Sequence, residues 1–253
     1  MIKNVSIALI AKNAQKTLRP CLESLTDFSE VIIYDNGSSD ETITIAKSFS
    51  NVTVVQGEWF GFGKTKKHAS SLATNDWIFS LDTDEHISKE LVNELQNLEL
   101  HHNKIYEVQR DNYYNNKLIK CCGWYGETIV RLYNRKTTDY NEDSVHEKVI
   151  DDNLEKVKLN HVIEHYSFEC VGDFLNKIQT YSEIFAKEHE GKKEASVFKA
   201  NFRGFFAFFK SYILRKGFSC GFEGFVISLF AGLGTTVKYL KLHERNKKLK
   251  LKN

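Results

Sequence analysis

The chain has 253 residues, of which 42% are hydrophobic, and its formal net charge at pH 7 is only +2. This length can bury a sizeable core in one domain with an appendage, and the small net charge argues against a nucleic-acid partner. Five cysteines form an odd set without a C-x-x-C pair, which indicates reduced thiols and a cytoplasmic location. We expect no signal peptide, because residues 1–4 lead directly into the first predicted strand.

The first hundred residues alternate between short apolar runs and helix-length segments. Apolar runs predict strands at residues 5–10, 31–34, 52–55 and 76–81. Pro20, the only proline, lies in the first helical stretch, so that helix must begin near it or bend there. Strands separated by helices imply right-handed βαβ units and a mainly parallel sheet with both faces covered. The predicted fold class is α/β.

The fourth predicted strand ends in the triplet Asp82, Thr83 and Asp84. Two carboxylates two positions apart on an extended segment project from the same side of it. At the carboxyl end of a buried parallel strand they face the edge where open α/β sheets bind ligands. Such a pair can hold a hard divalent cation, which in turn binds a diphosphate. Acidic triplets also occur as solvated turns, so the preceding elements are what favour a functional site here.

The second predicted strand leads into a polar turn that begins at Asp35. Ser38 and Glu41 have the spacing of a capping box, which predicts the start of a helix rather than catalysis. Asp35 comes before that turn, where the strand delivers its side chain to the edge of the sheet. A carboxylate there can accept hydrogen bonds from a nucleobase N–H or a ribose hydroxyl, so Asp35 is a candidate nucleotide ligand.

In their order along the chain, these motifs resemble glycosyltransferase family 2, whose fold is the Rossmann-like GT-A fold. The resemblance rests on residues 11–13, 35–40, 61–64 and 82–85. The closer resemblance is to the lipopolysaccharide core glucosyltransferases of Gram-negative bacteria, which add β-glucose to an inner-core heptose. It continues through the Val-His-Glu triplet at 145–147 to the Phe-rich C-terminal region, and therefore covers nearly the whole chain.

The resemblance implies a UDP-sugar donor and a divalent cofactor, Mg²⁺ or Mn²⁺. Asp82, Thr83 and Asp84 would lie at the diphosphate, with Asp84 the more direct metal ligand and Asp82 the second. Ala11 and Asn13 would line the nucleoside pocket, largely through backbone contacts. Asp35 would contact the uracil or the ribose.

Three lysines follow a glycine-flanked segment at 61–63. Lys64 and Lys67 lie three residues apart and share one side of the predicted helix, so both can approach one anion. We expect them to face the charge of the nucleotide. Lys66 is expected on the solvated face.

The inverting transfer that the resemblance implies needs a base. The acceptor hydroxyl attacks C1 from the face opposite the departing UDP while a carboxylate takes its proton. Four carboxylates in the acceptor half are candidates: Glu127, Glu142, Asp143 and Glu147. We favour Glu147, with Glu127 second, because the pair at 142–143 lies in a polar loop where surface charge is the ordinary explanation. His146 is a third metal ligand, an acceptor-orienting residue or a structural histidine.

Residues 158–165 alternate like a strand. His161 and His165, four apart, would suit a metal site on a helix, but a strand places them less usefully, so we do not expect zinc. From the sheet edge, His165 can approach the diphosphate.

The C-terminal third changes character. Residues 171–190 predict an amphipathic helix, residues 202–210 are dense in phenylalanine, and the apolar run at 225–233 is shorter than the ~20 residues that span a bilayer. The tail is basic, with Lys238, Lys241, Arg245, Lys247, Lys248, Lys250 and Lys252. Aromatic helices with a polybasic end fit a segment lying in the headgroup region of an anionic membrane. A helical cap on the sheet or a homo-oligomer interface is the alternative.

We therefore predict a nucleotide-sugar half at 1–100, an acceptor half at 101–170 and a C-terminal helical region at 171–253. The predicted activity is transfer of a hexose, with glucose favoured, to the lipid A–anchored core at the cytoplasmic face of the inner membrane. A family 2 enzyme with another acceptor, such as a polyprenyl phosphate or another surface glycan, is the first alternative. A catalytically silent membrane-bound scaffold is the second, and intact carboxylates at 35, 82 and 84 argue against it.

Overall fold

The structure, a computed structural model, describes residues 1–142 and 147–252. The chain divides into two compact units, and we describe each by itself. The first consists of Met1–Asp111 and Gly126–Tyr166, and the second of Asn112–Tyr125 and Ser167–Asn253. The division of the first unit into donor and acceptor halves stays a prediction.

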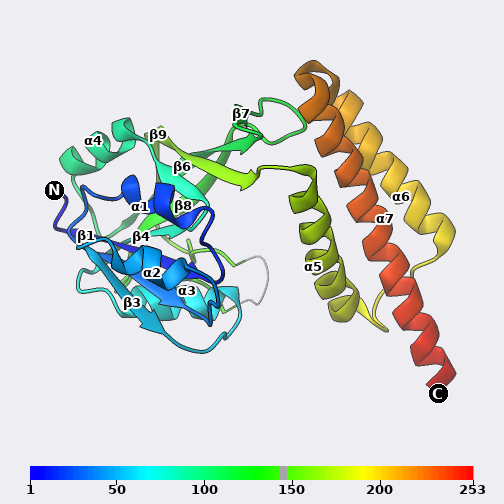
Figure 1. Ribbon diagram of the computed structural model, residues 1–253, viewed down its shortest axis with the longest axis horizontal. Coiled ribbons are helices and arrows are strands. Elements are labelled where there is room, and N and C mark those ends of the chain that lie inside the picture. The colour runs from blue at the N-terminus through cyan, green and yellow to red at the C-terminus, as the bar shows by residue number, and fades with distance from the viewer. Residues whose placement is uncertain (143–146, 253) are drawn as a thin grey trace. The chain divides into compact units, whose positions relative to one another are not determined.

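A mixed sheet with the order β3-β2-β1-β4-β8-β6-β9-β5 forms the centre of the first unit (Figure 1). Its elements are β1 (Val5–Ala11), α1 (Leu18–Glu23), β2 (Val31–Asp35), α2 (Thr42–Lys47), β3 (Val52–Gln56), α3 (Phe62–Ser71), β4 (Trp77–Asp82), β5 (Glu85–Ile87), α4 (Lys89–Asn97), β6 (Lys104–Tyr114), β8 (Glu127–Asn134) and β9 (Glu155–Phe168). The first four strands pair in parallel, whereas β8 pairs antiparallel with β4 and with β6. The α/β prediction is confirmed, and parallel pairing holds for the strands that the sequence defines most clearly.

Helices cover both faces of the sheet because alternate residues of its central strands point to opposite sides. Ile7 and Leu9 of β1 pack into one core with leucines of α1 and α4. Ala8, between them, packs into a second core with Ala69 of α3 and with Ala73, which follows that helix. Both faces are therefore dry, which explains why the strand runs are apolar throughout.

The local helix signals are confirmed in one case and wrong in the other. Pro20 lies in the first turn of α1, where its missing N–H leaves no hydrogen bond unmade. The capping box at Ser38 and Glu41 does not form, because α2 begins at Thr42 and the Ser38 hydroxyl donates to the carboxylate of Asp35 instead.

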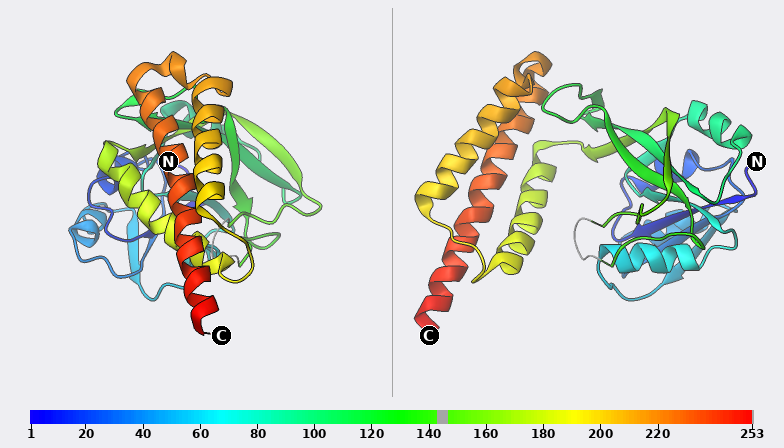
Figure 2. Two further views of the ribbon diagram at one scale, coloured as in Figure 1. Left: turned by 90° about the vertical axis from the view of Figure 1, so that its right-hand side faces the viewer. Right: turned by 180° about the vertical axis from the view of Figure 1, so that it is seen from behind.

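The second unit is helical. It contains the short strand β7 (Lys117–Leu118), α5 (Val171–His189), α6 (Val197–Phe209), the π-helical turn η1 (Lys210–Leu214), the 3₁₀ turn η2 (Gly217–Cys220) and α7 (Gly221–Lys252). The amphipathic helix predicted at 171–190 corresponds to α5. α7 packs along both α5 and α6, and Figure 2 shows the three helices from two further sides.

α7 is much longer than the apolar run within it. Gly217–Leu251 is, by length and composition alone, long and apolar enough to cross a membrane. Residues 225–233 were expected to be too short to span a bilayer. The helix that contains them is long enough, so this expectation is corrected. The nine residues were judged alone, but the helix continues on both sides of them.

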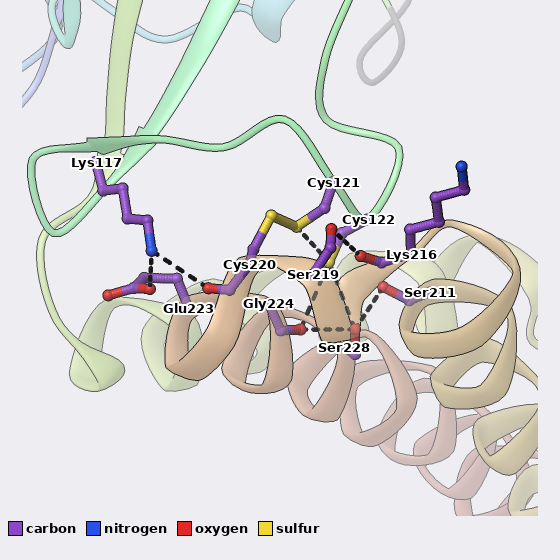
Figure 3. Close-up of a disulfide and its surroundings, with 10 residues drawn as sticks. All are labelled: Lys117, Cys121, Cys122, Ser211, Lys216, Ser219, Cys220, Glu223, Gly224 and Ser228. Carbon is purple, nitrogen blue, oxygen red and sulfur yellow. Dashed lines mark hydrogen bonds and ion pairs between the residues drawn. A yellow bond between two sulfur atoms is a disulfide. The ribbon is translucent and has the colours of Figure 1, made fainter.

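The expectation that all five cysteines are reduced is also wrong for one pair. Cys121 and Cys220 form a disulfide that joins the loop around β7 to the turn before α7 (Figure 3). Cys122 is buried beside them, with its sulfur 3.4 Å from that of Cys121. Lys117 reinforces the same junction through an ion pair with Glu223 at 2.8 Å. Cys121 and Cys220 are 99 residues apart in the chain, so no local sequence spacing predicts their disulfide.

Candidate active site

The carboxyl ends of β1, β2 and β4 meet at one edge of the sheet. In register, Ala11 of β1 lies opposite Asp35 of β2, and Ile10 lies opposite Asp82 of β4. The chain moves outward from β1 to β2 and β3 and then returns to the other side of β1 at β4. This reversal of strand order is the point at which open α/β sheets bind ligands. Three of the predicted nucleotide residues therefore share the expected edge.

Asp35 is buried and held by the turn that follows it. Its carboxylate accepts hydrogen bonds from the N–H groups of Gly37 and Ser38, each at 3.1 Å, and from the Ser38 hydroxyl. Asn13, with a positive φ of 51°, extends this network. Its N–H donates to the Ser38 hydroxyl at 2.8 Å, and its side-chain oxygen accepts from the N–H of Ser39 at 2.8 Å. The loops after β1 and β2 are thereby joined into one structure.

Asp82 lies between two buried cations. Its Oδ1 is 3.0 Å from Nζ of Lys66, and its Oδ2 is 2.7 Å from Nη2 of Arg131. The side chains of Lys66 and Arg131 are 7% and 5% exposed, whereas that of Asp82 is 30% exposed. The carboxylate therefore remains accessible from one side while both of its oxygens have a partner.

The protonation states of these three groups follow from their contacts. Burial alone would raise the pKa of Asp82, but the charges of Lys66 and Arg131 outweigh it and hold that pKa well below its ordinary value. Burial alone would lower the pKa of Lys66, but Asp82 raises it above the ordinary value. The pKa of Arg131 is likewise raised, because Glu85 and then Asp82 outweigh the cost of burial. All three groups are charged at neutral pH.

These contacts belong to a longer series of seven side chains whose charges alternate in sign. Arg131 also donates to both oxygens of the fully buried Glu85, at 2.5 and 2.6 Å. Lys66 also contacts Oε1 of Glu147 at 3.1 Å, and Arg110 links Glu85 at 3.5 Å to Glu127 at 2.7 Å. In order, the alternating series is Glu127, Arg110, Glu85, Arg131, Asp82, Lys66 and Glu147. The two preferred base candidates occupy its two ends.

The assignment of the three lysines of α3 is the clearest correction. Lys66, expected in solvent, is the one that contacts Asp82. Lys64 and Lys67 are about half exposed and both lie near the exposed carboxylate of Glu142, at 3.5 and 3.7 Å. They share one side of the helix as expected, but the anion within their reach is Glu142. Lys66 points inward because it lies on the helix face of Ala69, which packs in the core.

Asp84 and Thr83 lie in the turn between β4 and β5, beside β9. The backbone oxygen of Asp84 accepts from the N–H of Tyr166 at 2.8 Å, and its Oδ2 is 3.4 Å from Nε2 of His165. The expectation that His165 approaches this region from the sheet edge agrees with that distance. Asp84, two residues after Asp82 in the chain, thus forms a carboxylate–imidazole pair with His165.

A complete metal site is not assembled within residues 1–142 and 147–252. No group of three or more His, Cys, Asp or Glu side chains there is arranged to hold a metal ion. His146, the predicted third ligand, lies outside the described residues, as does the candidate base Asp143.

The remaining base candidates differ in position. Glu147 is 19% exposed and shares Lys66 with Asp82, which places it one cation away from the acidic triplet. Glu127 is 47% exposed and paired with Arg110, and Glu142 is more exposed still. Glu142 is outside the series, and of the two candidates within it Glu147 lies nearer to Asp82, separated by one cation.

Arg131 and Glu85 are functional candidates that sequence reasoning missed. Arg131 interrupts the apolar residues of β8, and a charged residue inside a buried strand is rarely present without a partner. That interruption was a usable signal for a buried ion pair. Nothing local, however, identifies Asp82, 49 residues earlier, as the partner.

Comparisons with known proteins identify sequences and structures that are similar to this chain. Residues 6–167 match the model of the family described as Glycosyl transferase family 2, and this segment includes the whole alternating series. An uncharacterized glycosyltransferase of Rickettsia prowazekii (strain Madrid E) is 29% identical, over 96% of this chain and 88% of the relative. The lipopolysaccharide core biosynthesis glycosyltransferase LpsC of Rhizobium meliloti (strain 1021) is 23% identical, over 96% of this chain and 93% of its own.

Among solved structures, S. aureus TarS 1–349 in complex with UDP covers 99% of this chain and 92% of its own, at 14% identity and a TM-score of 0.47. Glucosyl-3-phosphoglycerate synthase from Mycobacterium tuberculosis, in complex with Mn²⁺, UDP and glucosyl-3-phosphoglycerate, covers 44% of each chain, at 23% identity and a TM-score of 0.34.

Proposed function

Since this chain belongs to glycosyl transferase family 2 and is a glycosyltransferase, we propose that it moves a hexose, with glucose favoured, from a UDP-sugar to a heptose of the lipopolysaccharide or lipooligosaccharide inner core. Support for the acceptor comes from the pattern of the sequence and from the likeness to LpsC, whose name places that relative in core biosynthesis. We place the activity at a membrane surface, because such an acceptor is anchored by lipid A. The cytoplasmic face is the predicted side.

The observation that carries this proposal is the position of Asp82, at the reversal of strand order and between two buried, charged cations. Lys66 and Arg131 are held in place before any ligand arrives, so they need no reorganisation to stabilise negative charge that develops on a leaving diphosphate. The Asp82 carboxylate bridges the two cations, with one oxygen at Lys66 and the other at Arg131. Asp82, Glu85 and Glu147 neutralise the two cations, so net positive charge for a diphosphate would have to come from a bound divalent ion.

The residues at Asp84 fit part of a divalent-metal site. A carboxylate suits Mg²⁺ or Mn²⁺, and the imidazole of His165 lies within reach of the same ion. Asp84 would be the direct ligand, because both oxygens of Asp82 are engaged by cations. When bound, the ion would add positive charge at the diphosphate.

Glu147 is the proposed base that takes the proton of the acceptor hydroxyl. Lys66 holds its carboxylate at 3.1 Å and so fixes its direction relative to Asp82. A carboxylate within hydrogen-bond reach of the attacking hydroxyl removes its proton as the bond to C1 forms. Glu127, at the exposed end of the series, is the second candidate.

The test is release of UDP from a panel of UDP-sugars, with and without Mn²⁺, for the wild type, Asp84→Asn and Asp76→Asn. Asp76 is the matched control, because it forms a surface ion pair with Lys136 away from the sheet edge. The proposal expects release from one sugar that requires the metal, is lost in Asp84→Asn and is kept in Asp76→Asn. Failure of every UDP-sugar to bind or react, with core lipopolysaccharide supplied, would refute it.

A further inference from the structure

The second unit exposes an unusual number of large apolar side chains along α6, η1, η2 and α7. Phe198 is 81% exposed, Phe205 69% and Phe222 62%. Between residues 197 and 233, ten further large apolar residues are exposed as well: Val197, Phe202, Phe206, Phe209, Ile213, Leu214, Phe218, Phe225, Leu229 and Leu233. An exposed apolar surface of this extent marks a binding face rather than ordinary surface variation.

These side chains form two stripes. On α6 and η1, the exposed positions 198, 202, 205, 206, 209 and 213 follow the three- and four-residue spacing of one helical face. On η2 and α7, positions 218, 222, 225, 229 and 233 do the same. The residues that hold the helices together, such as Val226 and Ile227, are buried on another side of α7. Each helix therefore has an internal face and a separate, outward apolar stripe.

The charge of this region is strongly one-sided. Between residues 195 and 243 there are seven Lys or Arg residues and a single acidic residue, Glu223. Glu223 is neutralised by its ion pair with Lys117. Arg203, Lys210, Arg215 and Lys216 are exposed beside the stripes. Aromatic side chains flanked by cations suit the boundary between acyl chains and anionic headgroups.

A hollow between α6 and α7 repeats this chemistry on a smaller scale. Three phenylalanines and three cations contribute to its lining: Phe198, Phe202, Phe206, Lys199, Arg203 and Lys238. An aromatic floor with cations around it can seat a phosphate headgroup.

Gly217–Leu251 is long and apolar enough to cross a membrane, but Glu223 interrupts its uncharged stretch. Residues 224–237, between Glu223 and Lys238, are uncharged and number 14, whereas a span needs about 20. α6 is also fixed against α7, because a Cβ at Gly204 would lie 1.9 Å from Oγ1 of Thr236. α7 could therefore enter the hydrocarbon only together with the charges of α6.

We propose that the face formed by the two stripes docks onto an anionic lipid bilayer, with α6 and α7 lying in the headgroup boundary and not crossing it. Exposed phenylalanines enter the acyl region, and the flanking lysines and arginines contact lipid phosphates. The inference deepens the proposed function by naming the surface that meets the membrane. Its test uses no sugar donor, so its failure would leave the transferase proposal intact.

The experiment is flotation of the full chain with vesicles of phosphatidylcholine alone or with phosphatidylglycerol. We expect binding to the anionic vesicles, and a loss of at least tenfold in Phe205→Glu/Phe222→Glu. The matched control is Val171→Glu/Leu175→Glu, which adds the same charge at exposed apolar residues of α5, away from the stripes. Lys210→Gln/Arg215→Gln should reduce the preference for anionic vesicles. Circular dichroism confirms that each variant is folded.

Three results would overturn the proposal. The wild type could fail to float with anionic vesicles, or the α5 control could lose binding as completely as the stripe variant. Sedimentation without lipid could also reveal a dimer that Phe205→Glu/Phe222→Glu dissociates while neither protein binds vesicles, which would make the face an interface between two copies.

Discussion

Replacing Lys66 with Met tests whether the alternating series stabilises the first unit. The substitution keeps a linear side chain of similar length but removes the charge that contacts Asp82 at 3.0 Å and Glu147 at 3.1 Å. Lys64→Met is the matched control, because Lys64 belongs to the same helix but is 53% exposed, and its ion pair within the described residues is with the exposed Glu142.

The expected loss follows from burial. Removing one partner of a buried ion pair costs about 3–5 kcal/mol, because a desolvated charge is left behind. In Lys66→Met, Asp82 would still be 30% exposed and would still pair with Arg131, so its charge would not be left fully buried and unpaired. We therefore expect a smaller loss of unfolding free energy, about 2–3 kcal/mol. Surface pairs contribute about 0–1 kcal/mol, so Lys64→Met should change the free energy of unfolding by less than that.

Urea unfolding followed by circular dichroism between pH 3 and pH 8 measures both variants. The folded pKa of Asp82 is depressed, so its stabilising effect is present above the unfolded value of about 3.9 and is lost as pH falls through the folded value. Lys66 stays charged across this range, since its pKa is raised. The difference between wild type and Lys66→Met should therefore be constant near neutral pH and shrink below about pH 4.

The reasoning would be refuted if the two Met variants were equally stable at pH 7. A large loss for Lys66→Met that did not shrink in acid would also count against it. Equal stability would mean that packing of the aliphatic stem, which Met retains, and not the charge holds Lys66 in the core.

Three further substitutions test other parts of the structure. Glu147→Gln should lower kcat by at least about a hundredfold, as loss of a general base does, while Glu127→Gln keeps near-native turnover; the reverse result would move the base to Glu127. Gly204→Val should destabilise the second unit by roughly 1–3 kcal/mol in thermal unfolding, because the added Cβ would overlap Thr236. Adding Thr236→Ala should recover part of this loss. If Gly204→Val caused no loss, α6 and α7 would be less closely packed than the structure shows. Cys220→Ser should lower the free energy of unfolding by roughly 2–5 kcal/mol, because it removes the disulfide, and Cys122→Ser is the control. Peptide mapping that found Cys121 as a free thiol in the native protein would contradict the disulfide.

The fold of the first unit was predictable because its signals are local. Apolar runs without alternation marked strands covered on both faces, and the run at 76–81 identified β4 and, with it, the acidic triplet. The capping box at Ser38 and Glu41 predicted the start of the helix after β2, whereas α2 begins at Thr42. The Ser38 hydroxyl donates its hydrogen bond to the nearby charged carboxylate of Asp35 and therefore does not cap the helix.

The site was predictable only in part, because its ion pairs join residues far apart in the chain. Strand order alone brought Ala11, Asp35 and Asp82 to one edge. Choosing among the three lysines of α3 required knowing which side of the helix faces the core. The apolar residues Ala69 and Ala73 already marked that side in the sequence. Arg131 required knowledge that β8 lies beside β4, and no periodicity in the sequence carries that pairing.

The bond between Cys121 and Cys220 also divides the chain into a covalent ring and two linear arms. The ring contains β8, β9, α5 and α6, and with them Arg131 and Glu147. The carboxylates at the ends of β2 and β4 belong to the N-terminal arm. A protease that cut the turn between α5 and α6 would open the ring but release no fragment until the disulfide was reduced. The acceptor-side residues thus stay tethered to α7 even in a nicked molecule.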